Sequence, residues 1–271
     1  MKTYVITGAT SGIGNSLVRE FSAFNTVFAG GRNPEKLEDL RKISPNVIPF
    51  YIDMTNPETI VKAAEFIKSK TDRIDTIINT AGCVVAGPVE NLDISELRRQ
   101  FQVNTFSHLE FTQNLIAILD GGKIINISSM SSFGIFPFIS PYCASKRALD
   151  IIFNSLSLET QKNIRIISVK PGVIATPLWQ KSVKENENCI KGSSNYEKEM
   201  KFLAENALKN ETKGLKPEKV VELIVKIDRK KSPKPSYTVG MDAKIAEIFS
   251  RLPQNILNPI IKNRLKSKLK S

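Results

Sequence analysis

Short apolar stretches alternate with longer amphipathic ones along most of this 271-residue chain. The short stretches are rich in β-branched residues and bounded by glycine, proline or asparagine, which predicts strands over 3–7, 26–30, 46–52, 74–78, 123–127, 164–169 and 237–240. Apolar residues between them recur at helical spacing and predict helices over 15–24, 34–41, 57–69, 93–119 (whole or broken), 140–160 and 216–228. Strands and helices in this order predict a doubly wound parallel sheet covered on both faces, an α/β/α sandwich.

The pattern changes near residue 178. Residues 178–214 are polar and rich in Lys, Glu and Asn, with a few large apolar residues, which predicts a mobile helical lid over a substrate. Trp179 suits a pocket wall or a hinge anchor, and the sequence leaves both open. We therefore expect one catalytic domain over 1–240 and a basic, amphipathic helical extension over 241–271.

The formal net charge of +12 is concentrated partly in the last ten residues, which hold Lys262, Arg264, Lys266, Lys268 and Lys270. Such charge attracts phosphorylated cofactors, nucleic acid or anionic membranes. No nucleic-acid motif accompanies it, so we predict no nucleic-acid partner. Apolar residues recur every four positions beside these basic ones, at Leu257, Ile261, Leu265 and Leu269. Peripheral membrane contact by this helix and packing against its own subunit or a partner both remain open.

The remaining composition suits a globular protein of a reducing compartment. The three cysteines, Cys83, Cys143 and Cys189, show no metal-ligand spacing, which predicts free thiols and no metal site. The chain enters a strand directly after Met1 and has no apolar run of about 18–20 residues. We therefore expect a cytoplasmic location, with the possible membrane contact just described.

A glycine-rich turn separates the first strand from the first helix, with the spacing Gly8-x-x-x-Gly12-x-Gly14. Glycines let the backbone turn tightly and approach a pyrophosphate, while the helix amino terminus offers free N–H groups. The second strand ends in Gly30-Gly31-Arg32 without an acidic residue. Arg32 can hold a phosphate through a charge-assisted fork; a solvated arginine is the alternative.

Tyr142 and Lys146 lie four residues apart on one predicted helix and therefore share a face. A neighbouring ammonium lowers the pKa of a phenol, and such a phenol can exchange a proton with a carbonyl or alcohol oxygen. Ser129, at the end of the preceding strand, can hydrogen-bond the same oxygen.

These motifs together resemble the short-chain dehydrogenase/reductase family of the one-domain type, over about residues 3–180. The resemblance rests on four motifs. The first two are the turn from Thr7 to Gly14 and the run Asn79-Thr80-Ala81-Gly82, which has threonine where the family has asparagine. The others are the family's catalytic four, matched by Asn104, Ser129, Tyr142 and Lys146, and Pro171-Gly172 followed by Thr176. The part after residue 236 is weakly similar to the 17β-hydroxysteroid and retinol dehydrogenase branch. The resemblance implies a Rossmann-like fold.

The resemblance also implies a nicotinamide cofactor, and Arg32 favours NADP(H) over NAD. The implied cofactor-binding residues are Gly8, Thr10, Ser11, Gly12, Ile13, Gly14, Arg32, Asp53, Met54, Asn79, Ala81, Gly82, Tyr142, Lys146, Pro171, Gly172, Val173 and Thr176. For Asp53, an ordinary helix cap is an alternative that is compatible with cofactor binding.

The implied activity is hydride transfer between NADP(H) and an apolar carbonyl compound or secondary alcohol, lipid-, steroid- or retinoid-like. Tyr142 would exchange the proton, Lys146 would lower its pKa, Ser129 would orient the carbonyl, and Asn104 would complete a proton relay. The expected substrate-side residues are Val84, Val85, Ser129, Met130, Phe133, Phe136, Tyr142 and Leu178. His108 is expected in packing or an interface.

The resemblance to this family also implies that the protein forms a homodimer or homotetramer. The alternative to an enzyme is a non-catalytic NADP(H)-binding regulator, or a membrane-associated scaffold, on the same fold.

Overall fold

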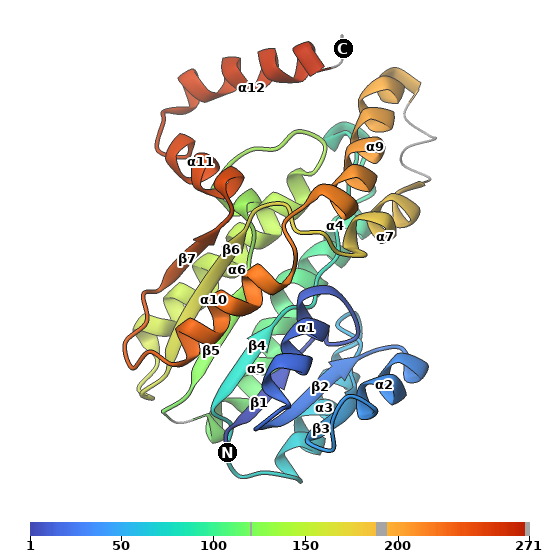
Figure 1. Ribbon diagram of the computed structural model, residues 1–271. Helices are drawn as coiled ribbons and strands as arrows, with labels where there is room; N and C mark the ends of the chain where they lie inside the picture. The colour runs from blue at the N-terminus through green and yellow to red at the C-terminus, as the bar shows by residue number, and fades with distance from the viewer. Residues whose placement is uncertain (120, 188–193, 269–271) are drawn as a thin grey trace.

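The computed structural model describes residues 1–119, 121–187 and 194–268 (Figure 1). Three residues used in the sequence predictions, Cys189, Leu269 and Lys270, lie outside this part of the chain.

The centre of the molecule is a seven-stranded parallel sheet in the order β3-β2-β1-β4-β5-β6-β7. All seven predicted strands are confirmed, with the bounds β1 (Thr3–Ile6), β2 (Thr26–Gly31), β3 (Val47–Tyr51), β4 (Thr76–Asn79), β5 (Lys123–Ile127), β6 (Arg165–Pro171) and β7 (Ser236–Val239). In the register of the sheet, Tyr4 pairs with Val27 on one side and Thr76 on the other. Pro49 is tolerated because β3 is an edge strand, where a missing N–H costs no ladder bond.

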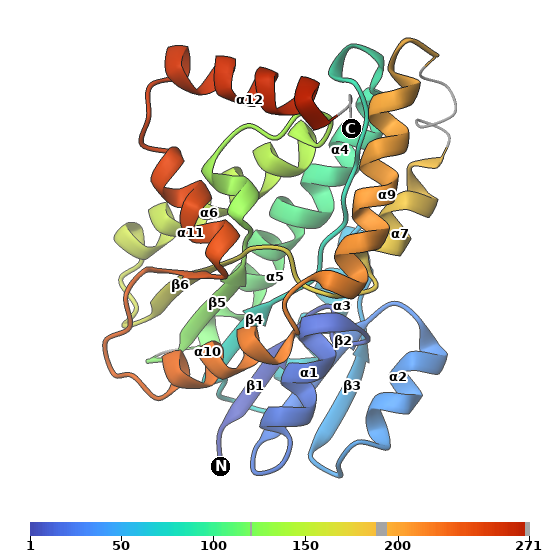
Figure 2. The same cartoon turned by 45° about the horizontal axis from the view of Figure 1, so that its top comes forward.

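Helices cover both faces of the sheet, as the alternating pattern predicts (Figures 1 and 2). One buried cluster joins the sheet to α1 and α10, and a second joins its other face to α3, α5 and α6. The helices are α1 (Gly12–Phe21), α2 (Pro34–Arg41), α3 (Pro57–Lys68), α4 (Ile94–Phe101), α5 (Ser107–Leu115), α6 (Ser140–Glu159), α7 (Leu178–Glu185), α9 (Glu197–Lys213), α10 (Glu218–Asp228), α11 (Met241–Phe249) and α12 (Gln254–Lys268).

Two helix boundaries differ from the sequence pattern. Helix α1 begins at Gly12 rather than Asn15, because the last glycines of the turn already form its first turn. The long stretch over 93–119 is broken: a π-helical turn, Gln102–Phe106, joins α4 to α5, and a 3₁₀ turn, Ile116–Ile118, follows α5. Such π turns are rare and concentrate at functional sites.

The elements after β6 gather at one end of the molecule. Figures 1 and 2 show α7, α9, α11 and α12 at the end towards which the strands run, opposite the N-terminus. Within the predicted lid, 178–214, the described residues form α7, a 3₁₀ turn, Ser194–Tyr196, and α9; residues 188–193 lie outside the described part of the chain. No helix in the described part of the chain combines the length and apolar character needed to cross a membrane.

A polar cluster closes the opposite end of the sheet, around the buried carboxylate of Asp228 at the end of α10. This carboxylate accepts hydrogen bonds from Lys2 Nζ (2.6 Å), Tyr4 Oη (2.8 Å) and Thr76 Oγ1 (3.1 Å). The Lys123 ammonium donates to the Asp228 carbonyl oxygen at 2.8 Å. One residue therefore ties α10 to β1, β4 and β5.

Candidate active site

A cavity of about 1060 Å³ opens at the carboxyl ends of the strands. Parallel α/β sheets bind ligands at this edge. The predicted site residues on its wall are Gly8, Thr10, Ser11, Gly12, Ile13, Gly14, Arg32, Asp53, Met54, Ala81, Gly82, Ser129, Met130, Phe136, Tyr142, Lys146, Pro171, Gly172, Val173, Thr176 and Leu178. Five predicted residues lie elsewhere, namely Asn79, Val84, Val85, Asn104 and Phe133.

The glycine-rich turn forms one wall of the cavity and lets a ligand approach its backbone closely. Gly8 and Gly12 have positive φ angles of 62° and 51°, which L-residues with side chains rarely adopt. A Cβ atom on Gly14 would lie 2.3 Å from the Gly8 carbonyl oxygen. Ser11 makes no side-chain cap bond, and the first turn of α1 holds no acidic residue. The free N–H groups of α1 thus suit an anion such as a pyrophosphate.

The threonine that departs from the family motif has a structural role. The Thr80 hydroxyl donates to the Thr7 carbonyl oxygen at 2.5 Å, and the Thr80 amide donates to Thr7 Oγ1 at 3.2 Å. Thr80 therefore fastens the end of β4 to the end of β1. Asn79, one residue earlier, is buried and donates to Asn126 Oδ1 at 2.8 Å instead of reaching the cavity.

Ser129, Tyr142 and Lys146 meet on the cavity wall. Ser129 follows β5, and the helix α6 brings Tyr142 and Lys146 beside it. The Lys146 ammonium is buried, donates to the Ile127 carbonyl oxygen at 2.8 Å and lies 6.0 Å from the Tyr142 ring centroid.

Burial dominates the electrostatics of this group. Burial raises the pKa of Tyr142 to about 12, and the neighbouring Ser129 hydroxyl opposes that rise. Burial also lowers the pKa of Lys146 to about 8, against the carboxylate of Asp150. The prediction that Lys146 lowers the pKa of Tyr142 is therefore wrong for this arrangement, in which the ammonium is bonded to the Ile127 carbonyl.

Asn104 lies behind this group, on the π-helical turn, and is fully buried. Its Oδ1 accepts from the Cys83 amide at 2.9 Å, while its Nδ2 donates to the Cys83 carbonyl oxygen and to Ser145 Oγ, both at 3.0 Å. Asn104 thus links the end of β4 to α6 one residue before Lys146. Its side chain is occupied by these bonds.

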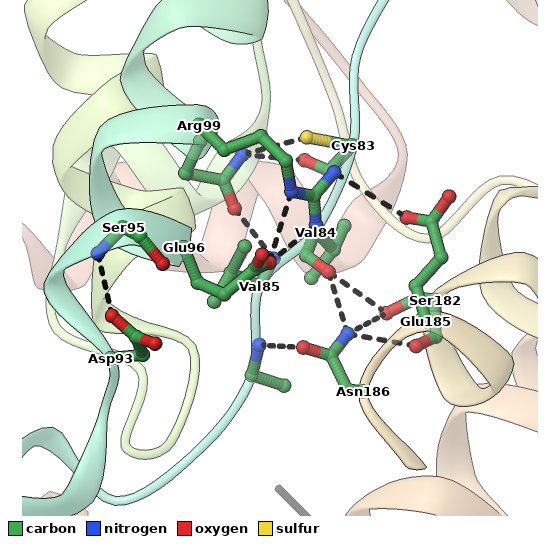
Figure 3. A network of polar contacts seen from close by, with 12 residues as sticks. Cys83, Val84, Val85, Asp93, Ser95, Glu96, Arg99, Ser182, Glu185 and Asn186 are labelled. Carbon is green, nitrogen blue, oxygen red and sulfur yellow. Dashed lines mark hydrogen bonds and ion pairs between the residues drawn. The ribbon is translucent and has the colours of Figure 1, made fainter. Parts of the chain in front are cut away.

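Two further side-chain amides hold the extended segment 83–86, as Figure 3 shows around Val84 and Val85. Gln100 of α4 accepts from the Val85 amide at 2.5 Å and donates to the Cys83 carbonyl oxygen at 2.7 Å. Asn186, after α7, accepts from the Ala86 amide at 2.9 Å and donates to the Val84 carbonyl oxygen at 2.7 Å. The side chains of Val84 and Val85 are buried in this layer, which explains why they are not on the cavity wall.

Phe133 is removed from the cavity by a different contact. The Lys170 ammonium lies 4.7 Å from its ring centroid and 3.1 Å from Asp150 Oδ2. A cation over an aromatic face and a buried ion pair hold this side chain against α6.

The loop after β6 uses most of its backbone amides internally. The Gly172 amide donates to the Val239 carbonyl oxygen at 2.8 Å, and the Val173 amide donates to Asp242 Oδ2 at 2.7 Å. The next amide, that of Ile174, makes no hydrogen bond to the described residues and is free to donate. Trp179 donates through Nε1 to the Ile174 carbonyl oxygen at 2.7 Å and also lines the cavity; its use as a hinge anchor stays a prediction.

Arg32 and Asp53, which were predicted to bind the adenosine end of the cofactor, also lie on the cavity wall. Arg32 is half exposed there. Asp53 Oδ1 accepts from the amide and the hydroxyl of Thr55, at 2.9 and 2.8 Å, while the cap of α3 is Asn56. Asp53 therefore shapes the turn before the helix and faces the cavity as well.

His108 is fully buried, with Nε2 2.9 Å from the Ala81 carbonyl oxygen. Since a carbonyl only accepts, Nε2 carries the proton. Burial, followed by the charge of Lys146, lowers the pKa of His108 to about 3. A neutral, buried histidine agrees with the packing role expected from the sequence.

A family model for the short chain dehydrogenase matches residues 2–187 of this chain. The chain belongs to the short-chain dehydrogenase/reductase family. It is therefore an oxidoreductase of that family, and the predicted family and fold are confirmed.

Relatives of this chain cover between about two thirds and nearly all of its length. An uncharacterized oxidoreductase, YusZ, from Bacillus subtilis is 29% identical over 276 residues, covering 97% of this chain and 98% of its own. An NADPH-dependent 3-dehydrocapnine reductase from Ornithobacterium rhinotracheale is 31% identical over 194 residues, covering 67% and 69%. Two 11-beta-hydroxysteroid dehydrogenases of Arabidopsis thaliana are 30% identical over 188 residues, or 66% of this chain and 54% of theirs.

A solved structure with the same fold is a short chain dehydrogenase from Burkholderia cenocepacia in complex with NADP. It superposes on this dehydrogenase with a TM-score of 0.74 at 24% identity, covering 96% of this chain and 99% of that one.

Some residues of this dehydrogenase's site were missed from the sequence, namely Arg99, Gln100, Ile174, Glu185 and Asn186. Gln100 had a usable signal, because it lies four residues before Asn104 and so shares its buried helix face. Asn186 and Glu185 had none, since their partners are distant in the chain.

Proposed function

We propose that this family member transfers hydride between NADP(H) and an apolar carbonyl compound or secondary alcohol. The observation that carries the proposal is the convergence of Ser129, Tyr142 and Lys146 beside the glycine-rich turn in one cavity. A non-catalytic regulator on the same fold would not need this catalytic group.

When bound, the cofactor supplies the hydride. Tyr142 donates a proton to the substrate oxygen, and Ser129 orients that oxygen by hydrogen bonding. A phenol with a pKa near 12 is protonated at neutral pH, so Tyr142 is ready to act as an acid. In this proposal Lys146, whose ammonium lies close to Gly82, would hold the nicotinamide ribose and resupply the proton.

Three observations support NADP(H) rather than NAD. The second strand ends without an acid, Arg32 faces the cavity, and a relative that covers two thirds of this chain is named as NADPH-dependent. An arginine suits a 2′-phosphate because its planar fork matches phosphate oxygens.

The substrate side supports an apolar ligand. Besides the catalytic group, the cavity is lined by Met130, Phe136 and Ile139, which precede α6, and by Leu178 and Val183 of α7 and Leu208 of α9. The hydroxysteroid dehydrogenases among the relatives are named for substrates of this character. We propose a lipid-, steroid- or retinoid-like carbonyl compound or alcohol, with α7 and α9 as its lid.

Fluorescence titration of the purified protein with NADPH and NADH tests this function. We expect NADPH to bind at least about tenfold more tightly, because a charge-assisted phosphate contact is lost with NADH. Equal or tighter NADH binding would overturn the choice of cofactor, and failure to bind either would overturn the enzyme and leave the membrane-associated scaffold as the alternative.

We also propose a homodimer or homotetramer, as the family resemblance implies. Exposed apolar residues on the outer faces of α4, the π-helical turn and α6 support it, namely Ile94, Phe106 and Ile151. Light scattering on the eluting protein would contradict the proposal if the mass were that of one chain.

Peripheral membrane contact through the carboxyl-terminal helices remains a proposal, but the apolar surface available for it is not the one predicted from the sequence. Leu257 is buried and Ile261 and Leu265 are half-buried, so the predicted stripe packs inward. The exposed apolar residues are instead Met241, Ile245, Ile248, Phe249, Leu252, Ile256 and Ile260. Deleting residues 254–271, which removes Ile256, Ile260 and the basic residues of α12, should reduce pelleting with anionic vesicles; unchanged pelleting would exclude α12 from the contact.

A further inference from the structure

The carboxylate of Glu185, at the end of α7, lies among cations from three different elements at the cavity wall. Its Oε1 is 3.9 Å from Arg32 Nη2 and 3.6 Å from Lys181 Nζ, and its Oε2 is 3.8 Å from Arg99 Nη1. All four side chains line the cavity. Figure 3 shows the Arg99 and Glu185 side chains reaching towards each other from opposite sides of the segment 83–86. Glu185, on the predicted lid helix α7, therefore forms an ion pair with Arg32.

The end of α7 is anchored independently of these charges. Asn186 is buried and bonded to the backbone of Val84 and Ala86, as described above. Ser182, one turn earlier, is buried in the same contact. Neutral hydrogen bonds thus fix the backbone on which Glu185 stands, so the carboxylate can change partners without displacement of the helix.

A phosphate that reaches Arg32 meets this carboxylate as a competitor. The phosphate dianion and the carboxylate are like charges, so they cannot both stay within ion-pair distance of one guanidinium without repulsion. Glu185 has alternative partners in Arg99 and Lys181, although Glu96 already occupies another edge of Arg99 at 2.7 and 2.9 Å. A ligand without the phosphate leaves the Arg32–Glu185 pair intact.

We propose that Glu185 is a specificity-determining residue that competes with the 2′-phosphate of the cofactor for Arg32. It neutralises Arg32 in the absence of the phosphate and releases it when the phosphate binds. This inference rests on the proposed NADP(H) function, because it requires Arg32 to be the phosphate ligand.

Calorimetric titration with 2′,5′-ADP and 5′-AMP, which differ only in the 2′-phosphate, isolates that phosphate without any turnover. Glu185→Gln removes the competing charge and keeps the size of the side chain. We expect it to tighten 2′,5′-ADP binding by about three- to tenfold and to change 5′-AMP binding by less than about twofold, since partly exposed ion pairs are weak. Glu197→Gln on α9 is the matched control, with the same charge change on the lid but away from the cavity wall, and should change neither affinity.

The same substitution in an Arg32→Ala background completes a double-mutant cycle. There the effect of Glu185→Gln on 2′,5′-ADP should vanish. An unchanged or weaker affinity of Glu185→Gln for 2′,5′-ADP, an equal gain for both ligands, or a gain that survives without Arg32 would each overturn the inference.

The controls separate this failure from that of the cofactor proposal. If the wild type prefers 2′,5′-ADP and Arg32→Ala loses that preference, the cofactor proposal stands even when Glu185→Gln has no effect. If the wild type shows no preference, both fail.

Discussion

The parallel sheet carries a buried polar cluster at each end, and the two clusters are built in opposite ways. At the amino ends of the strands, the Asp228 carboxylate receives bonds from Lys2, Tyr4 and Thr76. At the carboxyl ends, Ser128 Oγ on the cavity wall and Ser132 Oγ outside that wall are buried without a hydrogen-bond partner among the described residues. The first arrangement stabilises the fold, since satisfied polar groups specify and hold a core. The second leaves the Ser128 hydroxyl with hydrogen-bonding capacity beside the cavity, where a ligand can use it.

Tyr142→Phe, at the carboxyl ends of the strands, should have the largest effect, which is on turnover. Removal of the acid should lower turnover by about 10²–10⁴-fold, or roughly 3–5 kcal/mol of transition-state stabilisation. NADPH affinity and thermal stability should stay near those of the wild type, because the ring remains. Steady-state kinetics with a fluorescence titration check this. A variant that turned over normally would contradict the assignment of the acid.

The next effect should come from the amino end, with Asp228→Ala. Three buried or half-buried donors would lose their acceptor, at a cost of about 2–4 kcal/mol in the free energy of unfolding. The variant should still bind cofactor once folded at low temperature. Urea unfolding measures the loss. A loss below about 1 kcal/mol would show that this cluster does not hold the sheet.

Acid should also lower the free energy of unfolding through the Asp228 cluster, by less than Asp228→Ala does. Burial raises the pKa of the Asp228 carboxyl, but the hydrogen bonds from Lys2 and Tyr4 outweigh it, and the folded-state pKa lies below the ordinary value. The resulting stability is therefore present above the unfolded pKa of about 3.9 and is lost as the pH falls through the folded pKa.

Urea unfolding between pH 6 and pH 3 tests this dependence against Asp228→Asn, which cannot titrate at that position. The wild type should lose more stability than the variant over this range. Parallel curves would assign the acid sensitivity to other groups.

The smallest effect should come from Ser132→Ala at the carboxyl end. The hydroxyl is buried without a partner among the described residues, so its removal should change the free energy of unfolding by less than about 1 kcal/mol, towards higher stability. A loss comparable to that of Asp228→Ala would erase the distinction between the two ends.

The sequence predicts the scaffold better than the site's second layer. The seven strands follow from local β-branched runs, and the glycine turn follows from spacing, because both depend on neighbouring residues. The clamp on segment 83–86 was not predictable, since Asn186 bonds to residues about a hundred positions earlier. The pKa of Tyr142 was predicted in the wrong direction because burial is not visible in the spacing of Tyr142 and Lys146. Phe133 is aromatic and close in sequence to the site, yet Lys170, from another strand, holds it elsewhere.

Asp228 also sets the order in which the chain can finish folding. Its bond to Lys2 joins residues 226 positions apart, and its bond to Thr76 spans 152. During synthesis, β1 and β4 leave the ribosome long before α10 exists, so the nascent sheet must wait with its amino-end donors unpaired. Contacts of such long range slow folding, because the closure entropy is lost before the contact forms. A chain cut before residue 228 would lack this acceptor and also Val239 and Asp242, which hold Gly172 and Val173, so neither end of the sheet would be complete.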